Sequence, residues 1–179
     1  MATKKAQTFE DDIQEMEQEV DQESAGALAN LDFDLEDEYK PSPVIPGGNY
    51  YGSIVGVSHM ASKYAIAFKV CFNDNGVLMS DGATPVDGSH ETYMVWLPKP
   101  GDDKEYESNG KFTKRQGKIN RMADFAKELQ INMRTPQIIA EQIIDGTWIG
   151  IPVLCTVDIE EYQGRVRNRI ARMKRVADE

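Results

Sequence analysis

Apolar and polar residues alternate along several stretches of the chain, which is typical of β-strands with one buried face. The clearest stretch is 64–72, where the even-numbered residues are all aromatic or β-branched. Glycines at 52 and 56 indicate that the first such stretch is bent. Strands are expected over residues 49–57, 64–72, 92–97, 152–161 and 165–176. A short further strand is expected at 77–79, inside a turn-rich loop.

A helical period replaces the alternation between the third and fourth expected strands. Residues 115–129 carry an apolar face, and a second helix is expected over 135–145, with Thr135 as its N-cap and Pro136 at its first position. Gln163-Gly164 resembles the two-residue turn of a tight hairpin. The order of elements predicts a mainly β protein with helices: a five-stranded Greek-key barrel with a helical segment between strands 3 and 4. A sandwich or an open α+β sheet is the rival interpretation.

The first 40 residues have a different composition from the rest. Residues 1–38 hold 13 acidic residues and two lysines, a charge of −11, whereas the other 141 hold 17 acidic and 18 basic residues, a charge of +1, so the acidity of the chain comes from this arm. Prolines at 41–46 mark a boundary. We therefore expect an acidic, largely disordered arm (1–40) before a folded domain (41–179).

The arm carries apolar residues among its carboxylates. Those at 9, 13, 16 and 20 follow a helical spacing, and those at 31, 33 and 35 alternate with acids. One interpretation is a solvated tail that aids solubility. The other is a segment that docks on a partner protein. The candidate docking residues are Phe9, Ile13, Met16, Leu31, Phe33 and Leu35.

Several classes of protein are excluded or disfavoured. No run approaches 18 apolar residues, and the N-terminus lacks the apolar core of a secretory signal, so a cytoplasmic location is expected. Cys71 and Cys155 lie far apart in apolar stretches and are interpreted as free thiols. His59 and His90 lack metal-ligand spacing, and no nucleophile or phosphate-loop motif is present. Neither an enzymatic activity nor a metal or other cofactor is expected.

Two basic stripes lie within the folded part. Arg165, Arg167 and Arg169 recur at period two and therefore point to one side of a strand. They form either a track for phosphates or a polar face balanced by Glu160 and Glu161. The second stripe crowds the loop and first turns of the expected helix, where cations oppose the helix dipole. Its members are Lys111, Lys114, Arg115, Lys118 and Arg121.

Aromatic side chains complete a pattern that suits single-stranded nucleic acid, which is held by phosphate contacts and by bases stacked on rings. Tyr50, Tyr93, Trp96 and Tyr162 are the preferred stacking candidates. Because Tyr50 and Tyr51 are adjacent, they face opposite sides of a strand. Phe68, Phe72 and Phe125 are assigned to the core, and Trp148 is left open between core and platform.

Short segments are similar to those of a known family. The matching segments are IPGGNYYGSI (45–54), IAFKV (66–70), IDGTWIG (144–150), VLCTV (153–157) and EYQGRVRNRI (161–170). In these the chain resembles the phage-encoded OB-fold single-stranded-DNA-binding proteins. The resemblance implies an OB-fold barrel over about 44–176 and a role in DNA replication or recombination. In that family the acidic tail typically follows the barrel, whereas here it precedes it.

The favoured hypothesis is a non-catalytic protein that coats single-stranded DNA. Its acidic arm would compete with DNA for the basic face, recruit replication or recombination proteins, or do both. Self-association is a further possibility. The alternative is a phage inhibitor or adaptor whose acidic arm mimics DNA and binds a host nucleic-acid enzyme.

Overall fold

The computed structural model describes residues 22–177, and the chain divides into two compact units, Met1–Ser42 and Pro43–Glu179. In the first unit, residues 22–29 are helical and α2 spans Leu35–Glu38. The Asp34 carboxylate caps α2 by accepting hydrogen bonds from the backbone N–H groups of Glu36 and Asp37. This part of the arm therefore has more local structure than its acidic composition predicts.

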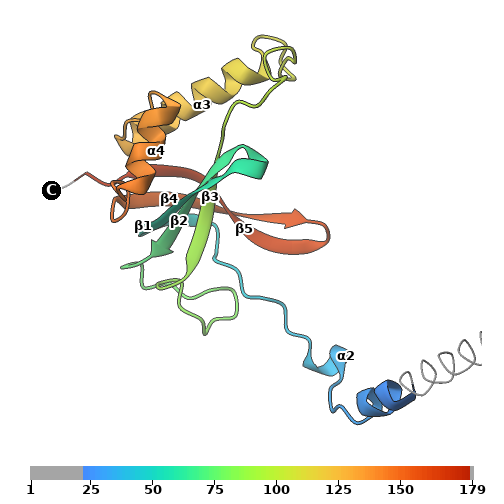
Figure 1. Cartoon of the computed structure of the whole chain (residues 1–179). Helices are drawn as coiled ribbons and strands as arrows, with labels where there is room; N and C mark the ends of the chain where they lie inside the picture. Colours follow the sequence, from blue (N-terminus) through green and yellow to red (C-terminus); the bar gives the residue numbers. More distant parts are fainter. Residues whose placement is uncertain (1–21, 178–179) are drawn as a thin grey trace, which may run out of the picture. The chain divides into compact units, whose positions relative to one another are not determined.

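The second unit is built on one antiparallel sheet of five strands (Figure 1), in the order β3-β2-β1-β4-β5. All five expected strands are confirmed, whereas the segment at 77–79 forms only an isolated bridge between Leu78 and Pro85. A short 3-10 helix, η1, joins β1 to β2. The strands are β1 (Gly48–Met60), β2 (Ala65–Phe72), β3 (His90–Trp96), β4 (Pro152–Tyr162) and β5 (Arg165–Arg175).

Two helices connect β3 to β4, as the sequence predicts. They are α3 (Lys114–Leu129) and α4 (Pro136–Ile144), and the Thr135 side chain caps α4 at the Ile138 N–H. Both helices lie at the same end of the sheet in Figure 1, and the β4–β5 hairpin projects past the other strands. Gln163 and Gly164 have φ values of 52° and 75°, which is the type I′ geometry that fits the twist of a hairpin.

The core lies on one face of the sheet, which we call the inner face. Phe68 is fully buried there, with its ring centroid 5.0 Å from Phe125 of α3 and 5.6 Å from Trp148. Trp148 is 2% exposed, which assigns it to the core. The edge strands β3 and β5 also contact each other, although the strand ladder does not join them. The sheet is thus strongly curved around this core.

A β-bulge in β5 keeps the side chains before and after it directed towards the core. Val157 pairs with Ile170 and Thr156 with Arg172, so Ala171 is the extra residue. Because of this bulge, both Ile170 and Met173 are buried, although they are three positions apart. The Asn168 side chain also faces inward, where it accepts from the Ile45 N–H at 2.7 Å and donates to the Ile45 carbonyl at 2.8 Å. This clamp fixes the chain just before β1.

The two cysteines are free thiols, and they should react very differently. Cys155 is fully buried, and burial raises the pKa of its thiol to about 12. Cys71 is half-buried on the opposite face of the sheet. At pH 8 a thiol reagent should therefore label one cysteine per native chain and both in urea, and Cys71→Ser should abolish native labelling. Rapid labelling of two thiols in the native protein would contradict this packing.

Candidate nucleic-acid interface

The face of the sheet opposite the core, here called the outer face, is strongly basic. Paired residues of an antiparallel sheet share a face, so the strand register assigns each side chain to one side. Only two strand carboxylates, Asp158 and Glu160, point outward among the described residues. The cations on this face are Lys69, Arg165, Arg167, Arg169, Arg172 and Lys174.

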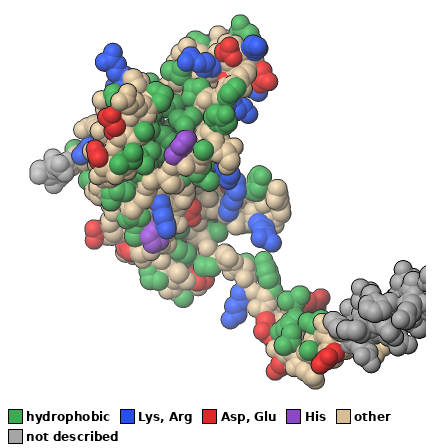
Figure 2. Space-filling view, in the orientation of Figure 1, with side chains coloured by type: hydrophobic (Ala, Val, Ile, Leu, Met, Phe, Trp, Pro, Cys, Tyr) green, Lys and Arg blue, Asp and Glu red, His purple; other side chains and the backbone are tan. Residues whose placement is uncertain are grey.

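The three arginines predicted to form a phosphate track lie together on the β4–β5 hairpin. Figure 2 shows basic side chains on this projection. Arg167 forms an ion pair with Glu160 at 2.7 Å, and Arg169 lies 3.5 Å from Asp158. The rival interpretation is therefore correct for Glu160, but Glu161 pairs with Val166 and faces the other way. Arg165 has no ion-pair partner within residues 22–177.

These ion pairs leave the arginines accessible. The side chains of Arg167 and Arg169 are 52% and 57% exposed. Exposed ion pairs contribute only about 0–1 kcal/mol, so a phosphate can replace the carboxylate. The Arg167 guanidinium also lies 4.1 Å from the centre of the Tyr162 ring. The guanidinium thus covers one face of the Tyr162 ring at the hairpin tip and leaves the other face for a base.

The outer face also presents three half-exposed aromatic rings. Trp96 and Tyr51 are each 50% exposed and Tyr162 is 51% exposed. Trp96 extends from β3, Tyr51 from β1 and Tyr162 from the end of β4. The sequence predicts stacking roles for Trp96 and Tyr162, but it favours Tyr50 over its neighbour Tyr51.

Two of the predicted stacking rings lie on the inner face of the sheet, where Tyr50 is part of the core and Tyr93 packs against it. Tyr50 is 5% exposed, its hydroxyl donates to the Pro46 carbonyl at 2.7 Å, and the prediction that it stacks on bases is wrong. Tyr93 lies on the inner face, where its ring stacks on Phe125 at 5.2 Å. Burial, helped by the Glu128 carboxylate, raises the Tyr93 pKa. A base has no access to the ring face that Phe125 covers.

The basic stripe on α3 is largely neutralised by the loop that precedes it. Lys118 donates to Asp102 at 2.7 Å and Arg121 to Glu107 at 2.8 Å, and Lys114 pairs with Glu105. These three ion pairs thus hold the loop at 98–113 against the first turns of α3. Lys111 and Arg115 have exposed side chains.

The Lys118 pair is the most enclosed of the three. Asp102 is 1% exposed and the Lys118 side chain 17%. The carboxylate also accepts from the Lys99 N–H at 2.9 Å, and the Lys118 hydrogen bond holds the Asp102 pKa below its usual range. A phosphate would have to displace a buried acid, so this ion pair disfavours the predicted contact between Lys118 and nucleic acid.

The apolar residues of the arm are exposed where the structure describes them. Leu31, Phe33 and Leu35 are 57%, 59% and 77% exposed. Phe9, Ile13 and Met16 lie outside the described residues. Exposed apolar side chains between carboxylates are available to a partner protein.

Within the described ranges there is no group of three or more His, Cys, Asp or Glu residues that could hold a metal ion. None of the helices between residues 22 and 177 is long and apolar enough to cross a membrane. A scan against protein-family models, a search of the curated proteins and a search of the solved structures found no match.

Proposed function

We propose that this chain binds single-stranded DNA without catalysis, as part of DNA replication or recombination in a phage. The observation that supports this most directly is the outer face of the sheet, where six cations and two strand carboxylates lie beside three half-exposed rings, one of the cations, Arg172, being paired with Glu128 of α3. Phosphate contacts combined with ring stacking are how proteins hold single strands. Duplex DNA, whose bases are already stacked, makes no use of the rings.

We also propose that the curved sheet is an OB-type barrel. The strand order, the contact between β3 and β5, and the helices between β3 and β4 all support this assignment. OB folds bind oligonucleotides across strands 2 and 3 and between the loops after strands 1 and 4. By that geometry DNA would run from Trp96 on β3 to Tyr162 and Arg165 at the hairpin tip.

The acidic arm would regulate this binding. Its 13 carboxylates can compete with phosphates for the basic outer face, and its exposed apolar residues can recruit a replication or recombination protein. The same exposed residues support the alternative function. In it the chain is an inhibitor or adaptor whose acidic arm mimics DNA and binds a host nucleic-acid enzyme. In that case the body would not bind DNA by itself.

A gel shift with labelled oligo-dT at two salt concentrations tests the proposal. The full chain alone should retard the single strand and should lose affinity steeply as salt rises. A duplex of the same length should be bound more weakly. If the chain does not retard oligo-dT at low salt but captures a basic protein through its arm, the inhibitor function is supported instead.

Replacing Trp96 with alanine should weaken oligo-dT binding about 5- to 150-fold, because one base–ring stack contributes ~1–3 kcal/mol. Trp96→Phe keeps a stacking ring and should retain most of the affinity. Both variants should melt close to the parent protein, since the indole is 50% exposed. Fluorescence anisotropy with labelled oligo-dT provides the measurement. Equal affinity of the alanine variant and the parent would remove Trp96 from the interface.

A further inference from the structure

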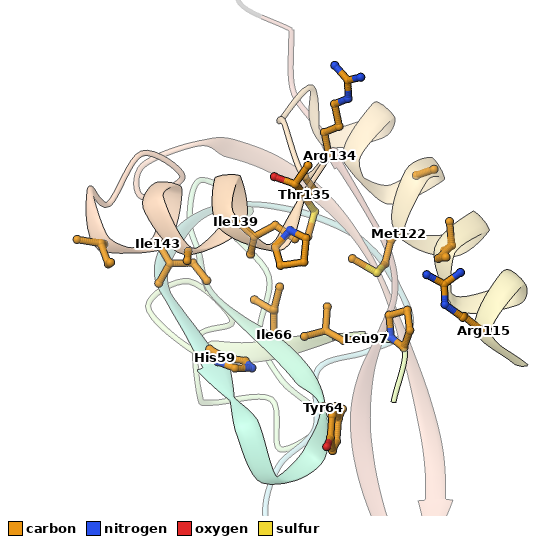
Figure 3. Close-up of a pocket in the computed structure, with 17 residues that line it drawn as sticks. His59, Tyr64, Ile66, Leu97, Arg115, Met122, Arg134, Thr135, Ile139 and Ile143 are labelled. Carbon is orange, nitrogen blue, oxygen red and sulfur yellow. The ribbon is translucent and has the colours of Figure 1, made fainter. Parts of the chain in front are cut away.

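An apolar groove lies on the other side of the sheet from the proposed DNA interface. It has a volume of about 790 Å³ and is bounded by α3, α4 and the inner face near the β1–β2 turn (Figure 3). Ile66 and Leu97 form its floor from the sheet side, Met122 projects from α3, and Ile139 and Ile143 project from α4. The groove therefore exposes apolar surface that the second unit itself does not cover.

The charged side chains that line the groove are two cations, Arg115 and Arg134, which lie at its rim, and no carboxylate is among the described residues that line it. An apolar channel with basic edges is complementary to an amphipathic helix whose polar side is acidic. It is poorly suited to DNA, whose phosphates would lie against isoleucine and methionine.

One segment of this chain has that chemistry. Residues 9–20 place Phe9, Ile13, Met16 and Val20 at the spacing of one helix face, and a helix of this length would span ~18 Å. The segment has no basic residue. Its carboxylates are Glu10, Asp11, Asp12, Glu15, Glu17 and Glu19. A carboxylate-rich helix is marginal alone and gains stability by burying its apolar face.

We propose that residues 9–20 dock in this groove of the same chain as an amphipathic helix. The apolar residues would contact Met122, Ile139 and Ile143, while the carboxylates approach Arg115 and Arg134. Leu31, Phe33 and Leu35 suit the groove less well, because their spacing of two belongs to an extended strand.

The tether permits docking within one chain. Residues 21–42 span roughly 40–50 Å when extended, with the helical residues kept helical. A flexible tether of this size gives an effective concentration near the millimolar range, which favours a segment of the same chain over a second copy. Docking here needs no DNA and is therefore tested in its absence, independently of the proposed function.

Methyl NMR of the full chain tests the docking directly. Ile13→Ser/Met16→Ser should shift the methyl signals of Met122, Ile139 and Ile143 and leave core methyls such as Ile54 unchanged. The matched control, Leu31→Ser/Phe33→Ser, should leave the groove signals in place. A synthetic peptide of residues 5–24, added to the Ile13→Ser/Met16→Ser variant, should restore them.

Two further outcomes decide the proposal. Arg115→Glu/Arg134→Glu alters two rim residues and should release the segment, giving the same methyl shifts as Ile13→Ser/Met16→Ser. The parent spectrum should not change with protein concentration. The proposal would be overturned if the methyl signals of the groove did not shift in Ile13→Ser/Met16→Ser, or if they shifted equally in the control variant. A dependence of these signals on protein concentration would also overturn it, because it would indicate binding to a second copy.

Discussion

Replacing Arg165, Arg167 and Arg169 together with glutamine is expected to weaken oligo-dT binding roughly 50-fold at 0.15 M salt. Each phosphate contact on a single strand contributes ~0.7 to the slope of log affinity against log salt, so three lost contacts should lower that slope by about 2. The hairpin itself should persist, because the three side chains point outward and are not part of the core. Anisotropy titrations at four salt concentrations would give both quantities.

A control variant, which removes two cations instead of three, tests whether the position of the charge matters. Lys114→Gln/Arg121→Gln also removes cations from the second unit, but these pair with Glu105 and Glu107 beside α3. This variant should leave the salt slope almost unchanged. If both variants reduce the slope equally, the outer face has no special role and binding follows overall charge.

The strands and helices could be predicted because most of each element follows a single period. The alternation through 64–72 identifies the inner residues of β2 correctly from Ile66 onward, and the hairpin arginines follow from the same rule. Tyr64 departs from it because its φ of 49° places it in the cap of the 3-10 helix before the strand. Its ring is consequently 41% exposed.

The choice between Tyr50 and Tyr51 illustrates where alternation becomes ambiguous. The bulge in β1 between Ile54 and Gly56 reverses the pattern, so Tyr50 shares the inner face with Ile54 and also with Val57, three residues further on. Strict alternation counted back from Val57 or His59 assigns Tyr51 to the inner face and makes Tyr50 the exposed ring, which is wrong. Alternation counted back from Ile54 assigns Tyr50 to the inner face and makes Tyr51 the exposed ring.

The ion pairs of the second basic stripe could not be predicted, because the partners of Lys114, Lys118 and Arg121 are distant in sequence. Lys118 and Asp102 are 16 residues apart, and Arg121 and Glu107 are 14 apart. A count of charge over a short window treats the helix and the loop as separate segments. Only the folded loop, with Glu107 packed against Gly117 of α3, reveals the compensation.

The apolar groove could not be inferred from any single segment. Met122 and Ile143 each belong to an ordinary amphipathic helix, and their partial exposure arises only from the way α3 and α4 meet the sheet. Sequence periodicity identifies which side of a helix is apolar. It does not show how much of that side another element covers.

Replacing Phe125 with alanine is expected to destabilise the second unit by about 3–5 kcal/mol and to lower its melting temperature by roughly 10–20 °C. The ring is 7% exposed and lies between Phe68 and Tyr93, at 5.0 Å and 5.2 Å. The cavity left by alanine would open at the point where α3 joins the sheet. Thermal and urea unfolding would measure the loss.

Phe125→Leu is the matched control, because it fills most of the same volume and should cost less than ~1.5 kcal/mol. A loss of under 1 kcal/mol in the alanine variant would show that other contacts, such as the buried Leu129, fasten α3 by themselves. Met122 lies one turn before Phe125 and forms a wall of the groove. The attachment of α3 through Phe125 therefore also fixes the width of the groove, and loosening it should weaken docking of residues 9–20 even where the outer face still binds DNA.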